Sequence, residues 1–208
     1  MLLTAALLMM SGCGGRAANS GANTGTGTSA NATGTNSVTG ASMAFDRSFE
    51  RDGIRFEVSS PNLLQGNSVT IKPEGLKDDN AEIKKNIRGQ IYDAVIDDLN
   101  DDKAPEIYIM LREPEGNRRA WAIGFASDKN RSLKQIVVED LDPASKDMLG
   151  YNGEDEYAFK NGIMTRSFPI LEGIGAEAKK SGKTRYIEYK LVPGDKNWEL
   201  DKIKADER

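Results

Sequence analysis

Short apolar runs with a period of two are the feature that most constrains the fold of this chain. Ile54, Phe56 and Val58 alternate with charged residues, and residues 68–72 and 187–191 show the same alternation. A period of two places the apolar side chains of a segment on one face, as in a half-buried β-strand. The pattern therefore predicts strands with one solvated face over much of the chain.

Two further segments, 106–111 and 120–125, carry apolar or small side chains at nearly every position. Such runs are typical of central strands that are buried on both faces. Turn residues separate the segments, and Asn161-Gly162 gives the strongest signal for a two-residue hairpin.

Helical signals are few. Only residues 142–149, where Asp142 precedes a proline and Gly150 follows, predict a short helix. Residues 43–208 are therefore expected to form an all-β, antiparallel, sandwich-like domain of about 8–10 strands with one short helix.

The chain begins with an apolar segment, 2–10, that ends at Ser11-Gly12-Cys13. This segment is too short to cross ~30 Å of hydrocarbon, so residues 1–12 are expected to be a signal peptide. Small residues directly before a cysteine resemble a bacterial lipobox, which implies that Cys13 is acylated and becomes the mature N-terminus. The alternative is a plain secretory signal followed by a buried or incidental cysteine.

The segment that follows Cys13 has low complexity. Of the 29 residues in 14–42, 27 are Gly, Ala, Thr, Asn or Ser, which is too little apolar surface to offset the entropy of ordering. Residues 13–42 are therefore predicted to be a lipid-bearing, disordered linker with a span of roughly 30 Å. Gly14, which is neither acidic nor basic, favours the outer membrane of the cell envelope by the enterobacterial sorting rule.

The composition excludes several classes of chemistry. The chain has no His and one Cys, which removes His-dependent triads, Cys-rich zinc sites and an intrachain disulfide. No phosphate-binding glycine motif or nucleophile elbow is present, and Glu154, Asp155 and Glu156 are expected to be solvated turn residues. The chain is therefore not expected to be an enzyme.

Charge is concentrated after the linker. Residues 43–208 contain 27 of the 28 basic and all 32 acidic residues. An acidic body makes nucleic acid a poor partner and favours a basic protein.

One acidic cluster has the spacing of a metal-binding loop. Its candidate ligands are Asp98, Asn100, Asp102 and Glu106. The order D-x-N-x-D-x-x-x-E suits the convergence of oxygen ligands on Ca²⁺, although Lys103 stands where glycine normally permits the turn. The alternative is a turn in which Asp and Asn side chains cap their own backbone. Calcium is the only cofactor that the sequence suggests, and none is required.

The most distinctive connection, residues 112–119, lies between the two predicted central strands. Its candidate functional residues are Glu115, Gly116, Asn117, Arg118 and Arg119. Loops held by core strands often carry binding function because the scaffold fixes their conformation. An ordinary polar loop is the alternative.

Six segments in the same order resemble the bacterial periplasmic inhibitors of invertebrate-type lysozyme. They are FDRSFERDGIRFEVSSPN at 45–62, SVTIKPEGL at 68–76, DLNDDKAPEIYI at 98–109, GYNGEDEYAF at 150–159, TRSFPI at 165–170 and RYIEYKLVPGDKNWEL at 185–200. The resemblance implies an all-β envelope domain that closes the active-site cleft of a lysozyme with a protruding loop.

The inhibitory loop of that family carries a Ser-Gly-x-Tyr motif, whose expected place here is 116–119, where the sequence is Gly-Asn-Arg-Arg. One interpretation is that Arg118 or Arg119 enters the cleft and pairs with catalytic carboxylates. The other is a surface-displayed binding or structural lipoprotein, stabilised by calcium, that does not inhibit lysozyme.

Overall fold

The alternating segments form strands in the computed structural model, which describes residues 44–138, 141–173, 175–195 and 197–208. The strands are β1 (Phe45–Arg51), β2 (Ile54–Ser60), β3 (Ser68–Glu74), β4 (Ile83–Asn86), β5 (Gln90–Asp97), β6 (Glu106–Arg112), β7 (Ala120–Asp128), β8 (Ser132–Val138), β9 (Glu156–Lys160), β10 (Ile163–Glu172), β11 (Lys179–Pro193) and β12 (Trp198–Glu207). This confirms the predicted all-β class, with two strands more than the upper expectation. The signal peptide 1–12, Cys13 and the linker to residue 42 lie outside the described residues.

The first four strands form an antiparallel sheet in the order β1-β2-β3-β4. A two-residue turn joins β1 to β2, since Arg51 pairs with Ile54, and its residues Asp52 and Gly53 have φ values of 52° and 79°. Every second residue of β2 from Ile54 is buried. The alternation that predicted a strand therefore also sets which face meets the core.

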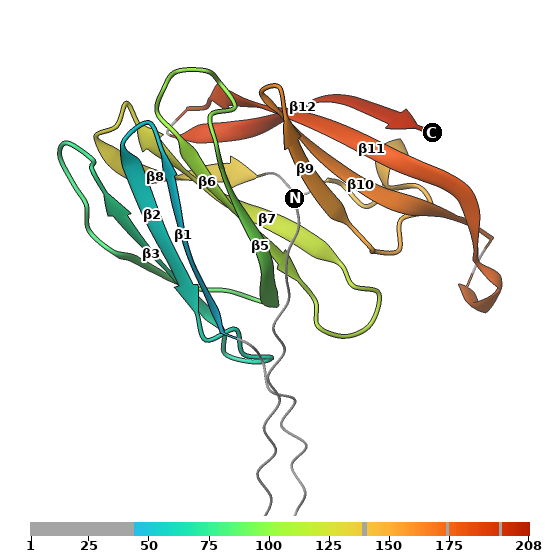
Figure 1. The fold of residues 1–208 in the computed structure, drawn as a ribbon. Coiled ribbons are helices and arrows are strands. Elements are labelled where there is room, and N and C mark those ends of the chain that lie inside the picture. Colours follow the sequence, from blue (N-terminus) through green and yellow to red (C-terminus); the bar gives the residue numbers. More distant parts are fainter. Residues whose placement is uncertain (1–43, 139–140, 174, 196) are drawn as a thin grey trace, which may run out of the picture. The chain divides into compact units, whose positions relative to one another are not determined.

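The other eight strands form one sheet in the order β5-β6-β7-β8-β12-β11-β10-β9 (Figure 1). All neighbours are antiparallel except β8 and β12, which are parallel. Asn161 and Gly162 form the predicted hairpin between β9 and β10, because Ile163 pairs with Lys160 and both turn residues have a positive φ. The local turn signal was thus correct.

Strand β6 lies between two hydrophobic cores. Ile107, Ile109 and Leu111 pack in the core that includes the four-stranded sheet, whereas Tyr108 and Met110 face the other core. That second core joins β6, β7 and β8 to β10, β11 and β12, so the eight-stranded sheet curves and packs against itself. Six of the seven β6 residues are buried, which confirms that this segment is a central strand.

The predicted helix over 142–149 is wrong except for one turn of 3₁₀ helix at Lys146–Met148. Instead of starting a helix, Asp142 closes a turn: its side chain accepts a hydrogen bond from the Ala144 amide at 2.8 Å, and its carbonyl accepts one from the Ser145 amide at 2.9 Å. So short a segment cannot offset the cost of helix nucleation. The only other helical turn among the described residues is the 3₁₀ turn Gly175–Glu177.

Candidate functional sites

The acidic loop, residues 98–105, connects β5 to β6. Asp97 pairs with Glu106 at the ends of these strands, so the strands bring the first and last candidate ligands toward each other. Within the loop, Asp101 and Lys103 adopt left-handed φ values of 56° and 61°. The loop therefore makes its sharp turn with Lys103 in the conformation that normally favours glycine.

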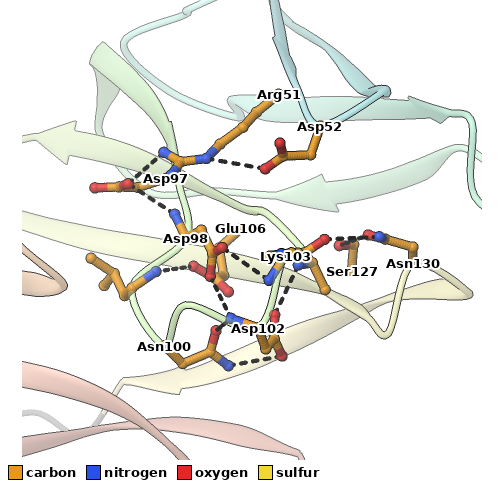
Figure 2. Close-up of polar contacts among 12 residues, drawn as sticks. Arg51, Asp52, Asp97, Asp98, Asn100, Asp102, Lys103, Glu106, Ser127 and Asn130 are labelled. Carbon is orange, nitrogen blue, oxygen red and sulfur yellow. Dashed lines mark hydrogen bonds and ion pairs between the residues drawn. The ribbon is translucent and has the colours of Figure 1, made fainter.

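Backbone amides of the acidic loop point at its own side chains (Figure 2). The Asp98 carboxylate accepts hydrogen bonds from the amides of Asp102 and Lys103 at 3.1 and 3.0 Å. Asp102 accepts hydrogen bonds from the Ala104 amide at 2.8 Å and from Asn100 Nδ2 at 3.0 Å. The structure thus confirms the self-capping turn. Because each carboxylate oxygen has two lone pairs, capping leaves acceptor capacity for a cation.

Glu106 is the buried member of this cluster, with only 1% of its surface exposed. Its Oε2 accepts a hydrogen bond from the Leu99 amide at 2.9 Å, whereas Oε1 is buried without a hydrogen-bond partner in the described part of the chain. Burial and, less strongly, the charges of Asp98 and Asp102 raise the pKa of Glu106 to about 8. The carboxyl group is therefore in surroundings that disfavour its negative charge.

We call Asp98, Asp102 and Glu106 the acidic triad. One carboxylate oxygen from each lies within 4.8 Å of the others. Arg51 forms an ion pair with Asp97 at 2.7 Å and does not bind the triad (Figure 2). Lys103 makes no ion pair within the described residues. The structure thus brings three of the four predicted ligands together without a side-chain cation, and Asn100 joins them through Asp102.

The arginine loop, residues 113–119, connects β6 to β7 at the other end of β6 (Figure 1). The Glu113 amide donates to the Arg119 carbonyl at 2.8 Å and closes the loop. Asn117 attaches it to the neighbouring turn: its Nδ2 donates to Asn152 Oδ1 at 2.7 Å, and its carbonyl accepts from the Glu154 amide at 3.0 Å. The loop is therefore exposed but held at both its ends and its middle.

The five predicted residues of this loop, Glu115 to Arg119, are all exposed. Arg118 has a φ of 52° and no ion pair among the described residues. Arg119 lies with its guanidinium 5.8 Å from the ring centre of Tyr151. The two adjacent arginines therefore have different surroundings, a distinction that their sequence does not reveal.

Asp155 was expected to be a solvated turn residue, and this is wrong. Its side chain is fully buried and accepts hydrogen bonds from the Ala120 amide, the Tyr151 hydroxyl and Arg166 Nε at 2.8, 2.7 and 2.8 Å. The Arg166 guanidinium also forms an ion pair with it at 2.7 Å. A carboxylate can be buried here because each oxygen has donors that replace water.

A pocket of about 710 Å³ adjoins the arginine loop, and no sequence pattern indicates it. Its lining includes Trp121, Ala122, Met148, Tyr151, Tyr157 and Arg119. The β7–β8 ladder begins only at Gly124 and Ile136, and the end of β8 pairs with β12. The first half of β7 therefore has no β8 partner, and the pocket lies where the two strands separate.

The chain matches no protein-family model, no curated protein and no solved structure. The resemblance to lysozyme inhibitors therefore depends on the six segments between residues 45 and 200. Within the part of the chain that the structure describes, no helix is long and apolar enough to cross a membrane.

Proposed function

We propose that this chain is a lipid-anchored protein of the bacterial envelope that inhibits a lysozyme by inserting the arginine loop into its active-site cleft. The observation that carries the proposal is the exposed Arg118, which has no ion pair among the described residues, on a loop that Asn117 fixes to the neighbouring turn. The acylated Cys13 and the linker to residue 42, which lie outside the described residues, supply the attachment to the outer membrane.

The chemistry of Arg118 suits a lysozyme cleft. Glycoside hydrolases place two carboxyl groups on either side of the bond they cleave, and a guanidinium group can donate two parallel hydrogen bonds to a carboxylate. A loop that is already held in one conformation loses little further entropy when it binds. Arg118 stands one residue before the place of the motif's Tyr, so it offers a charged group in the part of the loop where that family carries its inhibitory motif.

A lysis assay tests this proposal. The full chain carrying Cys13→Ser, which cannot be acylated but keeps every described residue, is titrated against invertebrate-, chicken- and goose-type lysozymes acting on bacterial cell walls. We expect stoichiometric inhibition of at least one type. Full activity of all three at micromolar excess of the chain would contradict the proposal.

The pocket favours a second candidate, in which the displayed domain binds a small organic anion. Its volume lies in the range of ligand sites, about 300–1,000 Å³. Arg166 is neutralised by Asp155, whereas Arg119 has no ion pair among the residues described here. One unpaired cation above aromatic and apolar walls suits a molecule with an apolar body and a single negative charge.

A fluorescence titration with the aromatic sulfonate 1-anilinonaphthalene-8-sulfonate separates the two candidates. Pocket binding predicts one saturable site that Arg119→Gln weakens about tenfold, the usual size of a lost charge-assisted contact, and that Arg118→Gln leaves unchanged. The inhibitor proposal instead predicts that, in the lysis assay, Arg118→Gln weakens inhibition more than Arg119→Gln does. Equal dye binding by both variants and the parent chain would exclude the pocket candidate.

A further inference from the structure

We propose that the acidic loop binds one Ca²⁺ ion through Asp98, Asn100, Asp102 and Glu106. This site is separate from the arginine loop, because β6 lies between them and seven residues of strand span roughly 23 Å. The inference therefore does not depend on the proposed inhibition of lysozyme.

The orphaned oxygen of Glu106 is the observation that points to a ligand. Only 1% of the Glu106 surface is exposed, and its Oε1 has no hydrogen-bond partner among the described residues. A buried acceptor without a partner bears the full cost of losing water. A cation within the triad supplies that partner.

The charges around Glu106 lead to the same conclusion. Three carboxylates converge within 4.8 Å, and like charges so close destabilise the loop unless protons or a cation neutralise them. The described arginine beside the loop, Arg51, is already paired with Asp97 and Asp52 (Figure 2). A divalent ion would neutralise the triad, with which no cationic side chain in the described ranges forms an ion pair.

The donor set favours calcium. All four candidate ligands offer oxygen, which suits the hard cations Ca²⁺ and Mg²⁺ and disfavours zinc or copper. Two oxygens at 2.3–2.6 Å on opposite sides of Ca²⁺ are about 5 Å apart, whereas across Mg²⁺ at 2.0–2.1 Å they are about 4 Å apart. The triad oxygens lie within 4.8 Å of one another, close enough to share one ion, and a mixed set of carboxylates and an amide suits the flexible coordination of Ca²⁺ better than the strict octahedron of Mg²⁺.

The exposed ligand, Asp102, gives the ion a route to the site. Asp98 and Glu106 are buried, whereas Asp102 is exposed. The ion can therefore enter from the side of Asp102 and reach the buried carboxylates without unfolding the sheet. The backbone bonds that cap Asp98 and Asp102 hold these side chains ready, so binding orders little additional chain.

Calorimetry and thermal melting test the site. The full chain with Cys13→Ser is freed of metal with a chelator and titrated with CaCl₂. We expect one ion per chain, and a melting temperature that rises by about 5–10 °C at a hundredfold excess over the dissociation constant. No binding heat and no thermal shift at millimolar CaCl₂ would overturn the proposal. Equal affinity for Mg²⁺ would overturn the assignment to calcium.

Two variants locate the ion. Glu106→Gln keeps the size of the buried side chain and an acceptor for the Leu99 amide, and Asp102→Asn changes an exposed residue that carries little risk to folding. Both are expected to lower calcium affinity at least tenfold and to lose the thermal shift. Asp101→Asn, an exposed neighbour outside the triad, is the control and is expected to bind normally. Normal binding by Glu106→Gln and Asp102→Asn would overturn the assignment to this loop.

Discussion

Asp155 shows how one side chain can organise the surroundings of a candidate site. Its carboxylate connects the start of β7, through the Ala120 amide, to Tyr151 and to Arg166 in β10. Glu154 and Glu156 on either side are 50% and 65% exposed. Nothing in a run of three acidic residues distinguishes the middle one, because its partners come from distant segments, so sequence reasoning could not find it.

Asp155→Asn is expected to lower the free energy of unfolding by about 3–5 kcal/mol, because it leaves the largely buried Arg166 guanidinium, 13% exposed, without its counter-charge. Chemical denaturation measures the loss. The matched control is Glu154→Gln, which removes an exposed pair with Lys180 and is expected to cost no more than about 1 kcal/mol. Equal losses of unfolding free energy in the two variants would show that the ion pair of Asp155 with Arg166 does not stabilise the fold more than an exposed pair does.

Among the secondary-structure elements, the hairpin β9–β10 could be predicted and the path of β8 could not. Asn161-Gly162 determines its turn locally, because both residues must take a positive φ. By contrast, β8 starts beside β7 and ends beside β12 in a parallel pairing. That pairing joins residues about 60 positions apart in the chain. The pocket, which lies where β8 leaves β7, therefore also depends on tertiary packing and not on a local sequence signal.

Gly162 is expected to be the sensitive position of this hairpin. Its φ is 72°, and a Cβ there would lie 2.9 Å from the Leu99 carbonyl oxygen of the acidic loop. Gly162→Ala should therefore destabilise the chain by about 2 kcal/mol or more, from backbone strain and crowding together. Gly66→Ala, at φ 63° with no atom within 4 Å, should show only the strain of about 1 kcal/mol. Thermal or denaturant unfolding of both variants measures the difference, and equal losses would contradict the contact with Leu99.

At the scale of the whole molecule, the two candidate sites lie at opposite ends of β6, and charge distinguishes them. The acidic loop has an excess of negative charge, whereas the arginine loop balances Glu113 and Glu115 with Arg118 and Arg119. The chain as a whole is acidic, with a net charge of −4, so a basic partner such as the proposed lysozyme would be attracted over distances of about a Debye length, ~10 Å at 0.1 M salt. The acidic excess is evident from the composition. That the two candidate sites lie at opposite ends of β6, with different charge, is evident only from the fold.

This attraction predicts a salt-dependent association rate. Raising the salt concentration from 50 to 500 mM should slow association with the proposed lysozyme partner by about tenfold or more and change the dissociation rate much less. Surface plasmon resonance measures both rates. An association rate that is independent of salt would show that the acidic body does not attract the partner.

The most direct test of the central claim is the inhibitory concentration of Arg118→Ala compared with that of Arg131→Ala. Both variants remove one exposed arginine and leave the same net charge, but Arg131 lies on the β7–β8 turn, where it pairs with Asp78. If the arginine loop enters a lysozyme cleft, Arg118→Ala should raise the half-inhibitory concentration at least tenfold, as loss of a charge-assisted contact does, and Arg131→Ala should leave it unchanged. Equal inhibition by the two variants would contradict the account.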